Sequence, residues 1–361
     1  MSSEESRTVR LGTGERLTIR VCEPPFPGGG EDLCWWGDAA ADVMAGKLRP
    51  WLYTPWYLGE IDGERAGYMS CWTPAEGREI GIVEFVSTAE AHRRKGVASA
   101  LLGQLVEDFT RAGGLALYLC TTNPHAGRLY ESHGFRYFVG DGMRYLAPEA
   151  GEFDRDYLGG GGPAVVREAT LADLPRAGAL FNHPEPRWIV KDSLSRCFHD
   201  TRYESHFLKT FLRLKGGKGV CLALENAAGR LVGLATVERR DTFAEHHTAV
   251  LSFRVAPAFT SRSAALLGAA VERCEALGIS ALSVHAADCD EDQKQLLEEA
   301  GFAEEARYED RLRAGGGFVD LVVYGRSSSP PAAPSFDTGE FYGGRQPWQR
   351  QRVAEAGGDS D

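Results

Sequence analysis

One turn of this chain contains residues whose types and spacing could bind an anion. It lies between a segment with the pattern of a buried strand and a segment with the pattern of a helix. Residues 82–86 are mostly apolar and suit a buried strand, and residues 98–109 carry apolar side chains at helical spacing. The turn holds Arg93, Arg94 and Lys95, followed by Gly96. A turn that leads into a helix points backbone N–H groups, with the positive end of the helix dipole behind them, at whatever lies over the helix start. We therefore predict an anion site here, although an ordinary connection with solvated arginines would explain the same residues.

The glycine in this turn supports the prediction. A Cβ at position 96 would occupy the volume of a ligand that approaches the backbone closely. Ala98 is the smallest residue that still keeps helix propensity. The pattern Arg93-x-x-Gly96-x-Ala98 resembles the pyrophosphate loop of the GNAT superfamily of acyl-CoA-dependent N-acyltransferases.

A second stretch resembles the same superfamily. Residues 123–135 fit its segment Asn-x-x-Ala-x-x-Leu-Tyr-x-x-x-Gly-Phe, with Asn123 first and Tyr130 at the tyrosine. Two matches in the family's order are far less expected by chance than either alone. The resemblance implies acetyl-CoA as the co-substrate, bound by the turn and helix start at Arg93, Arg94, Lys95, Gly96, Val97, Ala98 and Ser99.

The resemblance also implies catalytic roles. The backbone N–H of Val86 would bind the thioester carbonyl, Thr88 would pair with the pantetheine amide, and Asn123 would bond the pantetheine. Tyr130 would protonate the departing thiolate. Its alternative role is structural, as an aromatic side chain that packs on the inner face of the helix. Glu84 could deprotonate the amine directly or through water. It is equally compatible with the sequence that Glu84 is only a solvated strand residue and that an ordered water acts as the base. Strand alternation predicts that Glu84, Val86 and Thr88 share one face.

The elements that position these residues follow from periodicity and turn signals. We expect a strand at 18–22, a helix within 35–47, a hairpin of 53–61 with 65–72, a strand at 115–120 and a helix after Asn123. Pro55 indicates an edge or a bulge in the hairpin.

The second half of the chain repeats this order. The glycine-rich residues 151–163 are predicted as a linker, after which we expect a strand at 165–168, a helix at 171–180 and a hairpin of 220–225 with 231–237. Residues 266–272 resemble 101–107, and residues 298–302 resemble 131–135. We predict an α/β (α+β) chain of two tandem GNAT folds, each a mixed, mostly antiparallel twisted sheet flanked by helices. The catalytic domain is 1–150, a degenerate copy is 164–326, and 327–361 has the composition of a disordered tail.

The second copy has lost the motif. In either alignment of the two copies, no Arg or Gln fills the first slot of the loop and no glycine fills the second: the three slots hold Ala258, Ser261 and Ser263, or Thr260, Ser263 and Ala265. Leu297 stands in the slot of Tyr130, and Asp290 in that of Asn123, where a carboxylate suits a phosphate-rich cofactor poorly. We predict that this copy is catalytically silent. This copy could form one wall of the acceptor site, mediate a homodimer or bind a regulator.

Composition narrows the function further. The net charge of -11 argues against nucleic acid and mildly favours an amine partner. The 8 cysteines show no metal-ligand spacing with the 9 histidines, so we expect no metal and read the cysteines as buried thiols of a reducing cytoplasm. No apolar run approaches the roughly 20 residues of a membrane helix.

Aromatic residues crowd the region that forms the acceptor side in the resembling fold. They are Trp35, Trp36, Trp51, Trp56 and Trp72 with Tyr53, Tyr57 and Tyr68. They could hold a flat or cationic amine, although for most of them packing is the stronger expectation. We expect an N-acetyltransferase acting by direct attack on a primary amine of a small molecule. The alternatives are a non-catalytic CoA-binding sensor or scaffold, and an enzyme acting on protein N-termini or lysines.

Overall fold

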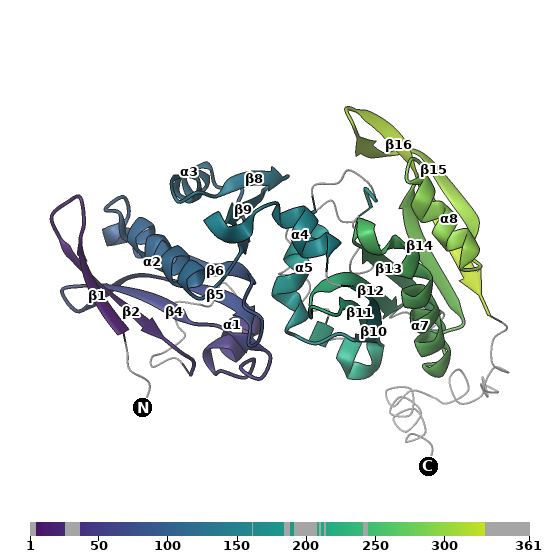
Figure 1. Ribbon diagram of the computed structural model, residues 1–361, viewed down its shortest axis with the longest axis horizontal. Helices are drawn as coiled ribbons and strands as arrows, with labels where there is room; N and C mark the ends of the chain where they lie inside the picture. The colour runs from purple at the N-terminus through teal and green to yellow at the C-terminus, as the bar shows by residue number, and fades with distance from the viewer. Residues whose placement is uncertain are drawn as a thin grey trace, which may run out of the picture. The chain divides into compact units, whose positions relative to one another are not determined.

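The computed structural model describes residues 5–25, 37–160, 162–183, 188–190, 208, 211–212, 214–240 and 245–328. Residues 1–326 form one compact unit that contains two mixed sheets flanked by helices (Figure 1). In the described residues, no helix has both the length and the apolar character that crossing a membrane requires.

The first half of the chain builds the first sheet. Its strands are β1 (Glu5–Arg10), β2 (Arg16–Cys22), β3 (Leu52–Tyr53), β4 (Trp56–Ile61), β5 (Glu64–Pro74), β6 (Ile80–Thr88), β7 (Ala116–Cys120), β8 (Arg136–Val139) and β9 (Gly142–Leu146). Its helices are α1 (Gly37–Met44), α2 (Val97–Arg111), α3 (Pro124–Ser132) and α4 (Phe153–Gly159). The strands are ordered β1-β2-β4-β5-β6-β7-β9-β8, with β3 paired to β5.

The second half repeats the arrangement. Its strands are β10 (Ala164–Glu168), β11 (Gly219–Asn226), β12 (Leu231–Arg239), β13 (Thr248–Val255), β14 (Ala281–Ala287), β15 (Ala303–Ala314) and β16 (Gly317–Ser327). Its helices are α5 (Asp173–Phe181), α7 (Ser263–Ala276) and α8 (Glu291–Glu299). The order β10-β11-β12-β13-β14-β16-β15 follows that of the first sheet. In both sheets one parallel pair, β6 with β7 and β13 with β14, sits among antiparallel neighbours.

The predicted fold class of two tandem, mostly antiparallel sheets is therefore confirmed. The predicted hairpins are β4 with β5 and β11 with β12. Pro55 lies just before β4 rather than in it, and β4 is an interior strand between β2 and β5, so the edge expected at Pro55 is wrong. The predicted helix at 98–109 is α2, whose buried residues are Val97, Leu101, Leu102, Leu105 and Phe109.

Helix α5 joins the two halves. It packs on β5 and β6 of the first sheet and on β12 and β13 of the second. Apolar side chains from both sheets and from α5, among them Trp56, Ile82, Phe181 and Leu234, form one continuous core cluster. Because such a cluster removes a large apolar area from water, the two halves stabilise one another.

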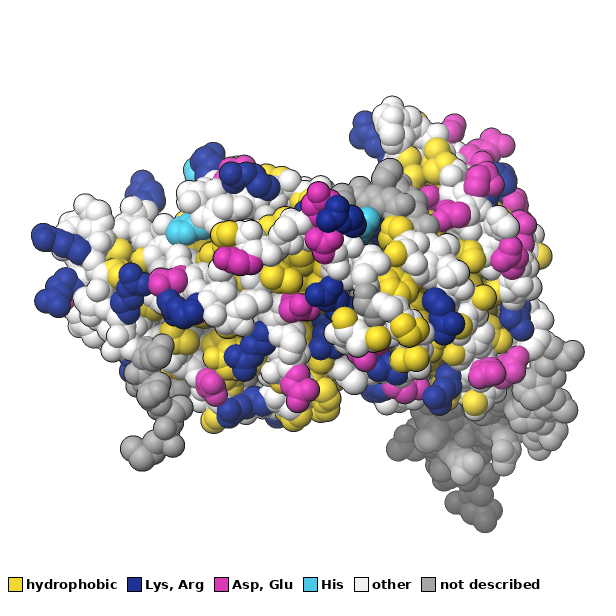
Figure 2. Space-filling model, in the orientation of Figure 1, with side chains coloured by type: hydrophobic (Ala, Val, Ile, Leu, Met, Phe, Trp, Pro, Cys, Tyr) yellow, Lys and Arg dark blue, Asp and Glu magenta, His cyan; other side chains and the backbone are white. Residues whose placement is uncertain are grey.

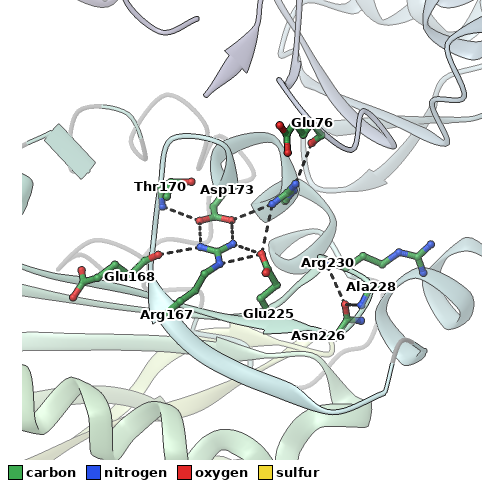
Figure 3. A network of polar contacts seen from close by, with 10 residues as sticks. Glu76, Arg167, Glu168, Thr170, Asp173, Glu225, Asn226, Ala228 and Arg230 are labelled. Carbon is green, nitrogen blue, oxygen red and sulfur yellow. Dashed lines mark hydrogen bonds and ion pairs between the residues drawn. The ribbon is translucent and has the colours of Figure 1, made fainter. Parts of the chain in front are cut away.

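A polar network fixes α5 at its first turn (Figure 3). Arg167 on β10 donates two hydrogen bonds of 2.7 Å to the fully buried carboxylate of Asp173 and two more to Glu225. Arg176, one turn along α5, reaches out of this network and donates to the backbone carbonyl of Glu76 in the first half at 3.1 Å. The network therefore ties the second half to the turn between β5 and β6.

The structure differs from two expectations drawn from the sequence, those for the linker and for the cysteines. The segment predicted as the linker, 151–163, contains α4, whose Phe153, Tyr157 and Leu158 are buried in the shared core cluster. The cysteines are not all buried: Cys120 is half-buried and Cys289 is exposed, while Cys34 and Cys197 lie outside the described residues. The predicted tail begins where β16 ends, and from residue 329 on it lies outside the described residues.

Candidate active site

The candidate site is centred on the point where β6 leaves β7. The two strands pair in parallel only from Ile80 opposite Ala116 to Ile82 opposite Tyr118. Beyond Ile82, no described strand pairs with this side of β6. Because β7 no longer covers this side of β6, a ligand can approach the strand backbone at Val86 and Thr88.

A β-bulge marks the same point. On β5, Tyr68 pairs with Ser87 and Ser70 pairs with Glu84, so two residues of β6 face the single residue Met69. Phe85 in the bulge has a φ of 57°, a left-handed conformation that is rare for a bulky residue and typical of functional sites when it occurs.

The bulge changes which side chains share a face. Phe85 joins the core cluster of Ile80 and Ile82, whereas Val86 packs against the cluster that contains Val83. Strict alternation therefore ends at the bulge, so a shared face of Glu84 and Val86 does not follow from alternation and stays a prediction.

Backbone direction after the bulge can be followed from individual hydrogen bonds. The backbone N–H of Cys71 donates to the carbonyl of Pro55, on the β4 side, so the backbone groups of the even-numbered residues of β5 point toward β6. The backbone N–H of Ala89 donates to the carbonyl of Ala66, so the backbone of Ala89 points toward β5. Ser87 is opposite Tyr68 and also faces β5. Alternation then directs the backbone of Val86 and Thr88 away from β5, toward the side that β7 has left.

The basic turn brings the start of α2 beside this strand. Gly96 has a φ of 94° and precedes Val97, the first residue of α2, and no side chain caps the helix start. The first backbone N–H groups of α2 therefore have no side-chain cap as a partner. Together with the helix dipole, they favour an anion at this end of the helix. Arg94 has a φ of 63° and an exposed side chain, and the Nε of Arg93 donates to the carbonyl of Thr88 at 3.4 Å.

Two predicted binding residues already have protein partners. The ammonium of Lys95 forms an ion pair with Glu15 at 2.8 Å, which draws it toward β1 and β2. The hydroxyl of Ser99 hydrogen-bonds Nε2 of His133 at 2.9 Å, and burial lowers the pKa of that histidine. Val97 is buried in the core beneath α2, so only its backbone can reach a ligand, whereas Ala98 is half-buried.

Helix α3 supplies the other side of the site. Asn123 caps this helix, because its side-chain oxygen accepts from the backbone N–H of His125 at 2.9 Å. Its exposed amide group keeps its two N–H donors. Tyr130 is 6% exposed and packs on Phe135, with ring centroids 5.8 Å apart. Burial, and the nearby carboxylate of Glu84 to a smaller degree, raises the pKa of Tyr130 to about 12.

The structure thus brings Glu84 and Tyr130 within electrostatic reach of each other, although they come from different elements. A tyrosine with this pKa remains a hydrogen-bond donor at neutral and mildly alkaline pH. Glu84 is half-buried on β6 beside the bulge. Together they form an acid and a base candidate at the point where the two strands part.

The corresponding place in the second copy is built differently. Strands β13 and β14 also pair over only three residues, from Thr248 opposite Ala281 to Val250 opposite Ser283. However, β12 and β13 keep an unbroken register, so the bulge is absent from this pair. The loop and the bulge are therefore both specific to the first copy.

The second copy fills the place with its own chain. Both oxygens of Asp290 accept backbone N–H groups, from Trp188 at 2.7 Å and from Ile189 at 2.6 Å. Arg254 on β13 donates to the carbonyl of Trp188 at 3.0 Å, and the Trp188 ring meets Phe253 edge-on. Trp188 has a φ of 53° and is 1% exposed, so these contacts hold an unfavourable backbone conformation in place.

The aromatic residues expected on the acceptor side mostly pack in the core. Trp56 stacks on Phe85 at 5.2 Å, and Trp72 meets the same ring edge-on at 5.4 Å. Tyr68 belongs to the same cluster, and Trp51 is exposed. Trp35 and Trp36 lie outside the described residues. The expectation of packing holds for Trp56, Trp72 and Tyr68, whose rings support the bulge from behind. It also holds for Tyr57, which is buried in the other core cluster of this sheet.

Comparison with known proteins places the chain in a family. The model of the acetyltransferase (GNAT) family matches residues 24–135 and, separately, residues 184–302. The chain therefore belongs to the GNAT acetyltransferase family, with two tandem domains of that family, and it is an acyltransferase. A search of curated proteins found no match.

Several solved structures are similar to part of the chain. A phosphinothricin acetyltransferase from Sinorhizobium meliloti, solved with acetyl-CoA, is 19% identical with a TM-score of 0.41, over 48% of this chain and 97% of that one. An N-acetyltransferase from Staphylococcus aureus is 17% identical with a TM-score of 0.40, over 46% and 99%. A ribosomal-protein-alanine N-acetyltransferase from Brucella melitensis is 21% identical with a TM-score of 0.37, over 45% and 99%.

Several residues that shape the site were not anticipated from sequence. Nothing in the residue type of Phe85 indicates a left-handed conformation, which usually belongs to glycine or asparagine. The pairs Lys95–Glu15 and Asp290–Trp188 join residues far apart in the chain, and only alignment of many related sequences could have linked them. The substitution of Asn123 by Asp290 between copies was the one available signal for the closed second site.

We predict that Asp290→Ala destabilises the protein by about 2 to 4 kcal/mol, because two buried N–H groups lose their acceptor. Urea denaturation measures the loss. Asp288→Ala is the matched control: this carboxylate pairs with Lys294 and Arg307 at the surface, where removal costs less than about 1 kcal/mol. Equal losses for the two variants would contradict the role assigned to Asp290.

Proposed function

We propose that the chain transfers an acetyl group from acetyl-CoA to a primary amine of a small molecule, with the chemistry in the first copy. The observation that carries the proposal is the divergence of β6 from β7 at a bulge, with the uncapped start of α2 at one end and Tyr130 beside it. The residues present fit this co-substrate: the amides that begin α2 favour its pyrophosphate, and the backbone of Val86 and Thr88, on the side that β7 has left, can pair with the amides of its pantetheine arm.

Each residue of the loop has a distinct part in holding acetyl-CoA. Gly96, Val97, Ala98 and Ser99 offer backbone N–H groups to the pyrophosphate. Arg93 and Arg94 add positive charge. Lys95 is paired with Glu15, so it contributes to the positive electrostatic potential around the pyrophosphate rather than through direct contact with it. Thr88 pairs with the pantetheine amide through its backbone, and the free N–H donors of Asn123 bind the same arm.

The chemistry then needs three groups. The amine nitrogen attacks the thioester carbonyl carbon while the C–S bond breaks, and the backbone N–H of Val86 stabilises the charge that develops on the carbonyl oxygen. Glu84, directly or through a water, accepts the proton that the amine loses. Tyr130 donates its proton to the departing sulfur and regains one from solvent.

The second copy supports the first without catalysis of its own. Helix α5 packs on β5 and β6, the strands that carry the bulge, from the side opposite α2. This placement supports the role of a wall on the acceptor side. On the face drawn in Figure 2, basic and acidic side chains are interspersed over both sheets, which suits a small-molecule partner better than nucleic acid.

The reaction itself tests the proposal. Purified protein incubated with acetyl-CoA and a panel of small primary amines is expected to release free thiol faster than protein without amine, as measured with a thiol reagent. The panel includes a peptide with a free N-terminus and one with an internal lysine. Acetyl-CoA binding without amine-dependent thiol release would support the sensor alternative, and turnover of the peptides alone would move the acceptor to protein.

A second prediction concerns Tyr130. Tyr130→Phe is expected to lower kcat by about 10²-fold or more while leaving acetyl-CoA affinity unchanged, because it removes a proton donor and little volume. Since Tyr130 acts when protonated and its pKa is raised to about 12, kcat of the unmodified enzyme should hold through pH 10. A fall in kcat with a midpoint near 10, or an unchanged kcat in Tyr130→Phe, would remove this role.

A further inference from the structure

A pocket of about 210 Å³ lies under the C-terminal end of α2, at the opposite end of that helix from the anion-binding loop. Its walls come from β2, β3, β4 and β5, from the turn before β6, and from the last turn of α2. The lining residues that carry the argument are Tyr53, Tyr57, Thr73, Arg78, Asp108 and Arg111. None of them belongs to the site proposed for acetyl-CoA.

Arg78 is the distinctive group in this pocket. Its guanidinium lies over the ring of Tyr53, 3.7 Å from the ring centroid, and the residue is half-buried. The other charged groups of the wall are satisfied, since Arg111 donates to Asp108 at 2.8 Å and to Glu107. Arg78 has no carboxylate partner within the described part of the chain. A partly desolvated arginine without a counter-charge favours an incoming anion.

A buried hydroxyl in the same wall also lacks a partner. The Oγ1 of Thr73 makes no hydrogen bond with any described residue, although Thr73 is only 4% exposed. An unpaired buried hydroxyl costs free energy. The cation in this wall, Arg78, is therefore the group that the pocket offers to a ligand.

The second copy gives an internal comparison. A pocket of about 190 Å³ lies at the equivalent place, under the C-terminal end of α7. Its two cations, Lys215 and Arg273, both pair with the carboxylate of Glu168, at 3.4 and 3.3 Å. The fold therefore creates the cavity in both copies, but only the first leaves an arginine without a carboxylate among the described residues.

The turn that carries Arg78 is held from the second half of the chain. Arg176 binds the carbonyl of Glu76, and Arg230 binds the carboxylate of Glu79 with two contacts of 3.0 and 3.3 Å. Figure 3 shows Glu76 joined by a dashed line to the network of Arg167, Asp173 and Glu225. A fixed turn places the guanidinium before a ligand arrives, which lowers the entropy lost on binding.

We propose that this pocket binds a small monocarboxylate with an aromatic or apolar body, about the size of benzoate. The fork of Arg78 takes the carboxylate in two hydrogen bonds, and the rings of Tyr53, Tyr57 and Phe109 take the body. Asp108 in the same wall repels a second negative charge, so inorganic phosphate binds more weakly. Neither Tyr130 nor Glu84 lines this pocket, so it is a binding site distinct from the acetyl-transfer site.

Calorimetric titration of the full chain in the absence of acetyl-CoA tests the site, so the result does not depend on transferase activity. Benzoate is expected to bind saturably, and benzamide, its neutral isostere, and inorganic phosphate at least about tenfold more weakly. Arg78→Gln should weaken benzoate binding by about tenfold or more. Arg273→Gln, at the equivalent pocket, should leave it unchanged.

The contrary outcomes are equally definite. Absent benzoate binding, benzamide or phosphate binding as tight as benzoate, or full affinity in Arg78→Gln would each overturn the proposal. Loss of binding in Arg273→Gln with retention in Arg78→Gln would move the site to the second copy and overturn it as well. If Arg78→Gln does not fold, the comparison of benzoate with benzamide on the unmodified protein decides the question.

Discussion

The divergence of β7 from β6 beyond Ile82 is the feature on which the rest of this structure depends. A strand interior to a sheet normally satisfies its backbone on both sides, and β6 does so only over Ile80–Ile82 before β7 diverges. The bulge at Phe85 and the uncapped start of α2 lie along the same edge. Each is unfavourable for an isolated fold, and all three are explained by one ligand that pairs with a strand and carries phosphate.

The second copy has the same strand divergence, but the polar groups beside it are arranged differently. Its strands diverge after the same number of pairs, but the register of β12 with β13 is regular and Asp290 binds backbone N–H groups of Trp188 and Ile189. The chain thus supplies its own partner for the polar groups that a cofactor would otherwise meet. A carboxylate suits this internal use because it accepts two N–H groups at once, and it disfavours a phosphate-rich ligand. In the second copy the carboxylate at this position therefore serves contacts within the chain.

Much of the fold could be predicted from sequence because its signals are local. Apolar spacing predicted α2, periodicity and turn signals predicted the hairpin of β4 with β5, and the motif residues located the loop and α3. The bulge could not be predicted, because the left-handed conformation of Phe85 is imposed by packing against Trp56 and Trp72. For the same reason the shared face of Glu84 and Val86 does not follow from alternation and stays a prediction. Alternation is a rule for regular strands, and the site is where the strand is irregular.

The long-range contacts were equally hidden from sequence. Residues 151–163 have the glycine content of a flexible connection, yet Phe153, Tyr157 and Leu158 bury themselves in the shared core. Helix α5 then covers the strands that carry the bulge, and Arg176 and Arg230 hold the turn before β6. The second half is therefore part of the framework of the first, which gives a physical reason for a domain without motif residues to be retained.

The stoichiometry of acetyl-CoA binding tests the central claim most directly. Calorimetric titration should give one acetyl-CoA per chain. Gly96→Val, whose side chain is incompatible with the φ of 94° at the start of α2, should abolish that binding while the second half stays folded. Two acetyl-CoA molecules per chain, or one that persists in Gly96→Val, would contradict the assignment of the cofactor to the first copy and the closure of the second.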